Sequence, residues 1–367
     1  MNKLVLAGNG FDLAHGMKTS YKDFICTYFK GLIKGVIEKQ SGYKNNAVKI
    51  DVRNRDLLVD YKWYSQISTN ITDESVIQIF SNQEYFSIGS REFYNIFSYN
   101  IENSIIKKAL NSLHEVNWVD IEEIYYDELL KLSGLHTSAL SINKHLLFII
   151  MELERYLSSI EIPPLNNDIL KILCRAFNPE DFKDQQVQLK NCKNITLLNF
   201  NYTTTLKFYQ DSLIKLLPGT EVDLINIHGE LNNRDNPIVF GFGDEMDDHY
   251  KTLEKLKDNT FLDYMKSFGY FRTNSYRRLI RFLEAGSFQV EIMGHSCGLS
   301  DRVMLNMIFE HPNCKSIKVN YYKWGDSYEE TNYKTLTQNI SRHFNKKTLM
   351  RDLVVDYGLS NEIPQSI

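Results

Sequence analysis

The sequence predicts an α/β protein with a Rossmann-like parallel sheet that is discontinuous in the chain and carries a large, mostly helical insertion. Three observations predict this fold class. Apolar or β-branched runs of strand length lie near the N-terminus and again after residue 190. Short loops rich in glycine and polar residues follow several of these runs directly. From about residue 40 to 190, helical periodicity prevails and strand signals are few.

The first strand is expected at Leu4–Ala7, a short buried run close to the N-terminus. An apolar stripe with helical spacing begins at Tyr21, so this strand leads into helix and not into a hairpin. The other expected strands are Ile195–Phe200, Val222–Ile227, Ile238–Phe240, Phe288–Met293 and Ile317–Tyr322. Because a lone strand cannot satisfy its backbone hydrogen bonds, the first strand is expected to join this later set in one sheet.

The expected domain organisation follows from this pattern. Residues 1–19 and 190–345 are assigned to a discontinuous nucleotide-binding domain, and residues 20–189 to the helical insertion. Residues 346–367 are assigned to a C-terminal tail. Within the insertion, residues 40 to 75 have weak periodicity and are expected to form a flexible loop.

Composition excludes several classes of protein. With 43% hydrophobic residues the chain can bury a large core, and 42 basic against 46 acidic residues argue against general nucleic-acid binding. No apolar run approaches the roughly 18 residues of a membrane span, and no secretory signal is evident, so a cytoplasmic protein without membrane contact is expected. The five cysteines contain no CxxC pair, which favours free thiols over disulfides or structural zinc.

The loops after the strands hold most of the polar residues that suggest chemistry. They are Gly8-Asn9-Gly10-Phe11-Asp12, Asn199-Phe200-Asn201-Tyr202, His228-Gly229-Glu230, Gly241-Phe242-Gly243-Asp244-Glu245 and Gly294-His295-Ser296. Because ligands of open parallel sheets bind outside the carboxyl ends of the strands, these loops are predicted to form a single pocket.

The first loop favours a nucleotide as ligand. Gly8 and Gly10 would let the backbone approach a phosphate, with Asn9 and Phe11 beside them. Leu13 stands where the complete dinucleotide fingerprint has its third glycine, so a tight strand-to-helix turn without a ligand is the alternative.

Three side chains are candidates for catalysis. His228 follows a strand directly and can act as a general base near neutral pH, or it can simply hydrogen-bond a turn. Asn201 can hold a ribose hydroxyl or a water, or it can shape the loop as an Asx-turn. Asp12 can polarise a water or meet a ribose hydroxyl, or it can cap a helix.

Further positions of the loops have assigned roles. Gly229, Gly241 and Gly243 are expected to allow close backbone approach to the ligand, and Gly294 with Ser296 to form a second phosphate or ribose loop.

For other polar residues the structural role is favoured. Asp301 is expected to cap a helix that begins near Arg302. Two charged clusters are expected to be solvated, so no metal site is predicted: Arg272, Arg277, Arg278 and Arg281, and Asp244, Glu245, Asp247 and Asp248. Trp118, Asp120 and Glu122 form an aromatic and acidic cluster that is either a lid or a packed core with surface acids.

The chain resembles the AbiH proteins of bacterial abortive infection against phage. The resemblance rests on GNGFDLAHG followed by TSYKDF, then WVDIE, FNYT, IHGEL, GFGDE and GHS in this order, and it runs through most of the chain. It implies a role in phage defence, with a phage-derived trigger as a partner.

AbiH proteins in turn are similar to sirtuin-like domains that bind NAD and cleave its nicotinamide bond. By motif, Gly8 to Asp12 match the first sirtuin loop, Asn201 the catalytic amide, and His228 with Gly229 the His-Gly pair. Asn9, Asp12 and Thr203 depart from the residues usual in that pattern. The chain lacks the CxxC…CxxC pair that forms the zinc module of protein deacylases, so protein deacetylation is not expected.

This similarity implies an NAD⁺ glycohydrolase that depletes NAD in infected cells and that the insertion or self-assembly restrains before infection. The alternative is a non-catalytic sensor of NAD or ADP-ribose that acts through a partner. An enzyme for another nucleotide or for nucleic acid is a third reading, which the charge balance disfavours.

Overall fold

The structure is a computed structural model that describes residues 1–39, 41–54, 71–80, 96–112, 121–135, 137–184, 192–243, 245 and 247–366. The chain forms two compact units. The sheet unit comprises Met1–Thr19, Leu157–Lys251 and Tyr264–Ile367, and the insert unit comprises Ser20–Tyr156 and Thr252–Asp263. In the described part of the chain, no helix is both long and apolar enough to cross a membrane.

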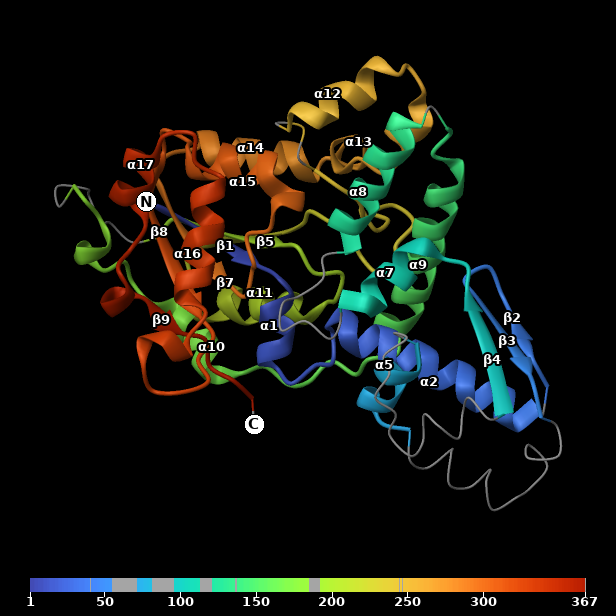
Figure 1. The fold of residues 1–367 in the computed structure, drawn as a ribbon. Helices are drawn as coiled ribbons and strands as arrows, with labels where there is room; N and C mark the ends of the chain where they lie inside the picture. Colours follow the sequence, from blue (N-terminus) through green and yellow to red (C-terminus); the bar gives the residue numbers. More distant parts are fainter. Residues whose placement is uncertain are drawn as a thin grey trace. The chain divides into compact units, whose positions relative to one another are not determined.

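A six-stranded parallel sheet organises the sheet unit (Figure 1). Its strands are β1 (Asn2–Ala7), β5 (Asn194–Asn199), β6 (Glu221–Asn226), β7 (Phe288–Met293), β8 (Cys314–Tyr321) and β9 (Asn361–Glu362). Their order is β6-β5-β1-β7-β8-β9, and every neighbouring pair is parallel. This is the 3-2-1-4-5-6 order of a Rossmann-type doubly wound sheet, so the predicted fold class is confirmed.

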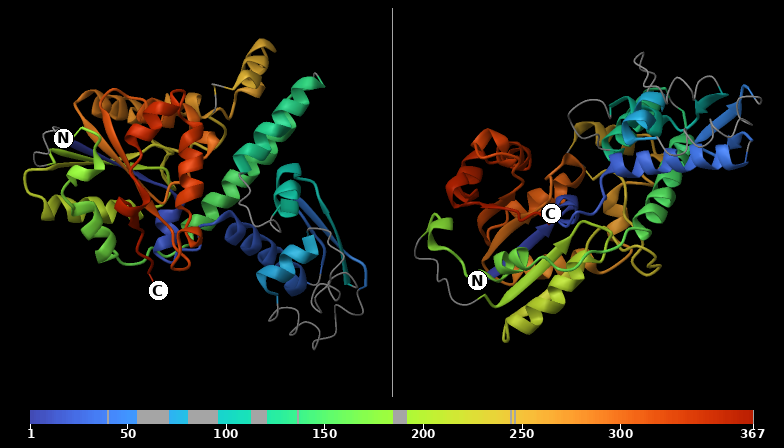
Figure 2. Two further views of the ribbon diagram at one scale, coloured as in Figure 1. Left: turned by 60° about the vertical axis from the view of Figure 1, so that its left-hand side comes forward. Right: turned by 90° about the horizontal axis from the view of Figure 1, so that it is seen from below.

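Helices cover both faces of the sheet (Figure 2). One face carries α1 (Asn9–Ala14), α10 (Asn167–Cys174) and α11 (Thr205–Leu216). The other carries α14 (Ser275–Glu284), α15 (Arg302–Phe309), α16 (Tyr333–Arg342) and α17 (Lys347–Leu353). The central strands β1 and β7 are buried along their whole length, as expected for strands covered on both faces.

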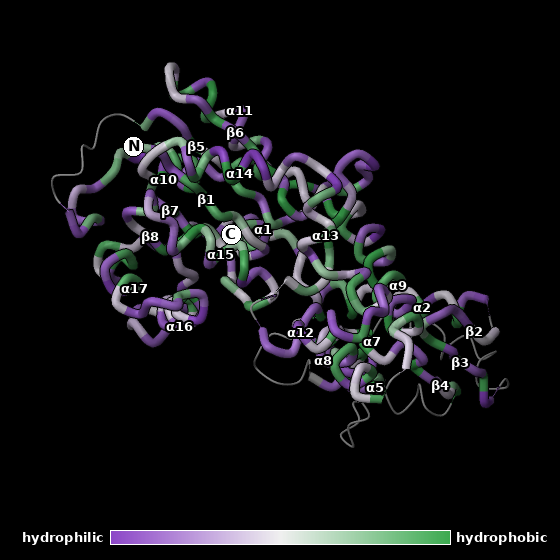
Figure 3. Tube along the Cα trace, turned by 90° about the horizontal axis from the view of Figure 1, so that it is seen from above, coloured by the Kyte–Doolittle hydropathy of each residue, from purple (hydrophilic) through white to green (hydrophobic). Residues whose placement is uncertain are grey.

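Side chains of β1 alternate between the two cores. Leu4 and Leu6 belong to one hydrophobic cluster, and Val5 and Ala7 belong to the other. This is the period-two alternation of a strand. The hydropathy view shows hydrophobic residues along β1 and a prevalence of hydrophilic residues in α16 (Figure 3).

The structure divides the chain at other residues than the sequence suggested. Leu157–Lys251 belongs wholly to the sheet unit, although residues up to 189 were expected in the insertion. The apolar side of α10 packs on the sheet through Ile169 and Leu173. Helical periodicity identifies an apolar face but not the core that the face joins.

The C-terminal residues are part of the sheet unit and not a separate tail. Leu353 of α17 lies in one core and Ile363 in the other. The strand β9 pairs with β8 at the edge of the sheet. A two-residue strand leaves too weak a sequence pattern to be recognised.

The strand expected at Ile238–Phe240 is absent, and these residues run as a loop. The Val239 amide donates to the His228 carbonyl at 2.8 Å, so the loop folds back beside the end of β6. Pro237 precedes the loop and cannot donate a ladder hydrogen bond. Between this loop and α14 lies the short helix α13 (Lys266–Tyr270).

The insert unit combines helices with a small antiparallel sheet. The helices are α2 (Tyr21–Lys39), α5 (Asp73–Phe80), α7 (Ser104–Ser112), α8 (Ile121–Gly134) and α9 (Leu140–Ser158). The helices α9 and α12 (Asp248–Lys255) contain residues of both units. The sheet has the order β2 (Tyr43–Lys44), β3 (Val48–Val52) and β4 (Phe97–Ile101).

Part of the loop expected between residues 40 and 75 is therefore a hairpin. The Asn45 side chain accepts the amides of Ala47 and Val48, both at 2.8 Å, and this turn joins β2 to β3. Val48 and Ile50 are buried on one face of β3. In the aromatic and acidic cluster, Glu122 is buried in α8, whereas Trp118 and Asp120 lie outside the described residues.

Candidate functional site

The loops after β1 and β7 meet at the switch point of the sheet, where the strand order reverses. A Cβ atom at Gly8 would lie 2.6 Å from the His295 Cα, and one at Gly10 would lie 2.7 Å from the Gly294 oxygen. Gly294 itself has a φ of +73° and contacts the Phe11 amide so closely that its Cβ would lie 2.1 Å from that nitrogen. These glycines allow the two loops to touch.

Amides predicted to hold a phosphate are already engaged in this contact. The Gly10 amide donates to the Gly294 oxygen and the Phe11 amide donates to the Gly8 oxygen, both at 2.8 Å. The Phe11 side chain is fully buried and packs against the rings of His15 and Tyr209. Asn9, the first residue of α1, is half-buried.

Asp12 and Asn201 form hydrogen bonds between the segments that follow β1 and β5. Thr203 Oγ1 donates to Asp12 Oδ2 at 2.6 Å, while Asp12 Oδ1 has no hydrogen-bond partner among the described residues. Burial raises the pKa of Asp12 to about 6, against the lowering effect of the Thr203 hydroxyl. Asn201 Nδ2 donates to the Gly8 oxygen at 3.0 Å. Both side chains therefore support the loop after β1.

The Asx-turn that was the alternative for Asn201 is made by a neighbouring residue. Asn199 Oδ1 accepts the Asn201 amide at 3.1 Å, and Asn199 is buried at the end of β5.

The helix α2 is capped by Ser20 and Asp23, with the Asp23 amide donating to Ser20 Oγ at 3.1 Å. Asp12 lies within α1 and does not cap it.

His228 is buried beyond the end of β6 and held by polar and aromatic neighbours. Its Nε2 atom lies 3.0 Å from Asp301 Oδ1 and 3.3 Å from the Tyr270 hydroxyl. The Tyr270 ring is parallel to the imidazole, with 6.3 Å between the centroids and 10° between the planes. The Phe200 ring meets the imidazole edge-on at 5.1 Å.

Asp301 is the site residue that sequence reasoning misassigned. It precedes α15 as expected, but its carboxylate caps nothing there and instead binds His228 and Lys266, whose Nζ lies 2.9 Å from Oδ1. Burial would raise the pKa of Asp301, but the Lys266 ammonium and His228 outweigh burial and hold it well below its usual range. The position of Asp301 shortly after a glycine loop could have marked it as a site residue, but no sequence signal points to its partners His228 and Lys266.

The predicted glycines after β6 serve backbone contacts. Gly229 has a φ of +88°, and a Cβ atom there would lie 2.2 Å from the Pro237 oxygen. A Cβ atom at Gly241 would lie 1.8 Å from the Tyr264 oxygen. Ser296 is exposed, and its carbonyl accepts Asn339 Nδ2 at 2.8 Å.

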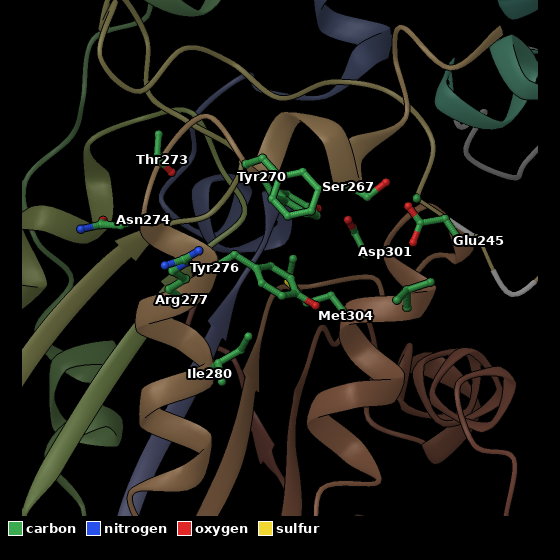
Figure 4. Close-up of a pocket in the computed structure, with 13 residues that line it drawn as sticks. Glu245, Ser267, Tyr270, Thr273, Asn274, Tyr276, Arg277, Ile280, Asp301 and Met304 are labelled. Atoms are coloured by element: carbon green, nitrogen blue, oxygen red, sulfur yellow. The ribbon is translucent and has the colours of Figure 1, made fainter. Parts of the chain in front are cut away.

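A cavity of about 580 Å³ opens in the sheet unit among α13, α14 and α15 (Figure 4). Its size is that of a pocket for a small organic ligand. Tyr270 and Asp301 line the cavity and also contact His228, which lies behind them. Of the glycines assigned to the ligand, Gly243 lines it.

Most of the two charged clusters is solvated as expected, since Arg272, Arg277, Arg281 and Asp248 are exposed. Arg277 and Glu245 line the cavity, and Arg278 pairs with Asp223. Asp244 lies outside the described residues. Within the described residues, no group of three His, Cys, Asp or Glu side chains is placed to hold a metal ion.

Comparison with known proteins identifies the family. No curated protein sequence matches the chain. A family model described as bacteriophage abortive infection AbiH matches residues 4–323, which include the loops after β1, β5, β6 and β7. The chain therefore belongs to the AbiH family, which implies a role in abortive infection against phage.

Proposed function

We propose that this AbiH protein is an NAD⁺ glycohydrolase that depletes NAD in infected cells. The observation that carries the proposal is the buried His228–Asp301 pair, at 3.0 Å, whose aspartate lines a ligand-sized cavity at the carboxyl edge of a Rossmann-like sheet. A histidine oriented by a carboxylate is a common arrangement for a general base. The similarity of the loops to sirtuin-like NAD-cleaving domains supports the choice of substrate.

The proposed reaction consumes one water and one NAD⁺. The bond between the nicotinamide nitrogen and the ribose C1′ breaks, its electron pair leaves with nicotinamide, and the water oxygen bonds to C1′. The water proton passes to His228 at Nδ1, because the Nε2–H group of the neutral imidazole is donated to the ionised Asp301 carboxylate. Asp301 stabilises the imidazolium that results, and the products are nicotinamide and ADP-ribose.

The substrate is placed in the cavity and not on the loop after β1. The amides of Gly10 and Phe11 already have backbone acceptors, so they are poor candidates for the pyrophosphate in this conformation. We assign Asn201 and Asp12 a positioning role, because Asn201 holds the Gly8 carbonyl and Asp12 binds Thr203.

The test is nicotinamide release by the purified protein, followed by chromatography, with and without phage lysate. The variant His228→Ala should lose turnover, while His249→Ala, which changes an exposed histidine of α12, should retain it. Absence of turnover from the wild-type protein under both conditions would overturn the proposal.

One observation favours a second candidate function, the sensing of NAD or ADP-ribose without cleavage. His228 is only 5% exposed, and the described lining of the cavity does not include it. A sensor would bind the nucleotide without releasing nicotinamide, and His228→Ala would leave phage defence intact in a plaque assay.

A glycohydrolase in a living cell requires restraint before infection. We propose that the insert unit or self-assembly provides it and that a phage-derived trigger relieves it. Substitutions in the insert unit that make expression toxic without phage would support this proposal, and harmless ones would argue against it.

A further inference from the structure

The cavity among α13, α14 and α15 has an acidic end and a basic end. Asp301 and Glu245 lie toward one side of it with Ser267, and Arg277 lies toward the other side with Asn274 (Figure 4). Tyr270 and Tyr276 lie between these groups. A ligand that fits both ends carries positive and negative charge at separate positions.

The middle of the cavity suits a flat ring. The Tyr270 and Tyr276 rings are stacked, with 5.5 Å between the centroids and 19° between the planes. The Tyr270 ring is also parallel to the His228 ring. Ile280 and Met304 form apolar parts of the cavity wall. Aromatic rings of nucleotides stack on such surfaces.

The acidic end offers charge and a buried hydroxyl. The Asp301 carboxylate is ionised beside Lys266, and Glu245 adds a second carboxylate to the lining. Ser267 Oγ is buried and has no hydrogen-bond partner among the described residues. A positively charged ring that also carries a carboxamide would be matched by the carboxylates and by this hydroxyl.

The basic end offers one guanidinium for an anion. Arg277 is exposed on α14, and no ion pair of this side chain occurs among the described residues. Its neighbour Arg278 is committed to Asp223. A guanidinium binds phosphate through parallel hydrogen bonds, which makes Arg277 the suitable phosphate ligand of the cavity.

We infer that this cavity binds the nicotinamide mononucleotide half of NAD⁺. The cationic ring lies between the tyrosine pair, Tyr270 and Tyr276, on one side and the carboxylates on the other, and the phosphate binds Arg277. The inference rests on the proposed function for its choice of ligand and adds the placement of that ligand. It makes Tyr276, Arg277 and Glu245 determinants of specificity.

The first test is calorimetric binding of nicotinamide mononucleotide and of NAD⁺ to the full chain carrying His228→Ala, so that the ligand is not consumed. In this background, Arg277→Gln should weaken binding about tenfold or more, as expected for a lost charge-assisted hydrogen bond. Arg281→Gln, on the same helix but outside the cavity lining, is the matched control and should leave binding unchanged. Equal affinities for the two variants would overturn the placement.

The second test uses the charge of the ring. NAD⁺ should bind more tightly than NADH, whose ring is neutral, and Glu245→Gln should reduce this preference. Tyr276→Phe should bind like the parent, whereas Tyr276→Ala should bind more weakly. Equal binding of NAD⁺ and NADH would contradict the inference. Thermal melts of each variant show whether it is folded.

The two proposals can fail separately. Nicotinamide release that Arg277→Gln leaves unaffected would keep the glycohydrolase and remove the ligand from this cavity. Binding with the expected specificity but without nicotinamide release would keep the ligand placement and favour the sensor.

Discussion

Asp301 Oδ1 lies 3.0 Å from His228 Nε2, and both side chains are buried at the carboxyl edge of the sheet, 73 residues apart in the chain. Lys266 approaches the same carboxylate oxygen at 2.9 Å, so one ionised aspartate holds a histidine and a lysine. The pair joins the end of β6 to the residue that precedes α15. This arrangement makes Asp301 as informative as His228 for testing the proposed activity.

Asp301→Asn should lower the rate of nicotinamide release by about 10²- to 10⁴-fold, the usual contribution of general base catalysis. The amide cannot balance the charge of a protonated His228. The measurement is kcat at saturating NAD⁺, and the KM should change less than kcat. An unchanged kcat in a folded variant would remove Asp301 from the mechanism.

Lys266→Met should destabilise the sheet unit by about 3–5 kcal/mol, because it leaves the buried Asp301 carboxylate without its main counter-ion. Only 1% of the Lys266 side chain is exposed, so water cannot replace the ammonium. Urea unfolding of the wild type and the variant gives the change in free energy. The double variant Lys266→Met with Asp301→Asn should be less destabilised than the sum of the single variants, and strict additivity would argue against a coupled pair.

Gly294→Ala should destabilise the protein by more than about 1 kcal/mol, since alanine is strained where φ is positive. The added Cβ would also lie 2.1 Å from the Phe11 nitrogen, so the contact between the loops after β1 and β7 must open. Gly358→Ala is the matched control, because its Cβ would meet nothing within 4 Å. A shift in melting temperature confined to the first variant is the expected result.

Asp12 should make stability fall as pH rises between about 4 and 6. Its pKa is raised from 3.8 to about 6 in the folded protein, so the folded state binds more protons than the unfolded state in this window. The loss of stability is complete above the pKa that Asp12 has in the folded state and absent below the pKa that it has in the unfolded state. In the wild type the free energy of unfolding should therefore decrease by on the order of 2–3 kcal/mol across this window, and Asp12→Asn should abolish this decrease.

Urea unfolding of both proteins at several pH values isolates this contribution, because other groups titrate in wild type and variant alike. Parallel pH profiles for the two proteins would show that Asp12 ionises normally in the folded state.

The sequence by itself determined the α/β class, the position of most strands and the loops at their carboxyl ends. β7 begins and ends at the predicted residues, Phe288 and Met293, because a buried strand needs a short continuous apolar run. Such signals are local, because the secondary-structure propensities of neighbouring residues and the spacing of apolar residues suffice to produce them.

Only the tertiary structure decided which groups meet. Asp301 has the sequence position of a helix cap, yet it binds His228 and Lys266, and Gly8 and Gly10 contact Gly294 and His295 where a phosphate was expected. β9 joins the sheet far from the other strands in the chain. The physical reason is that hydrogen-bond partners and close backbone contacts between distant segments depend on how strands and helices pack, and local sequence patterns do not encode that packing.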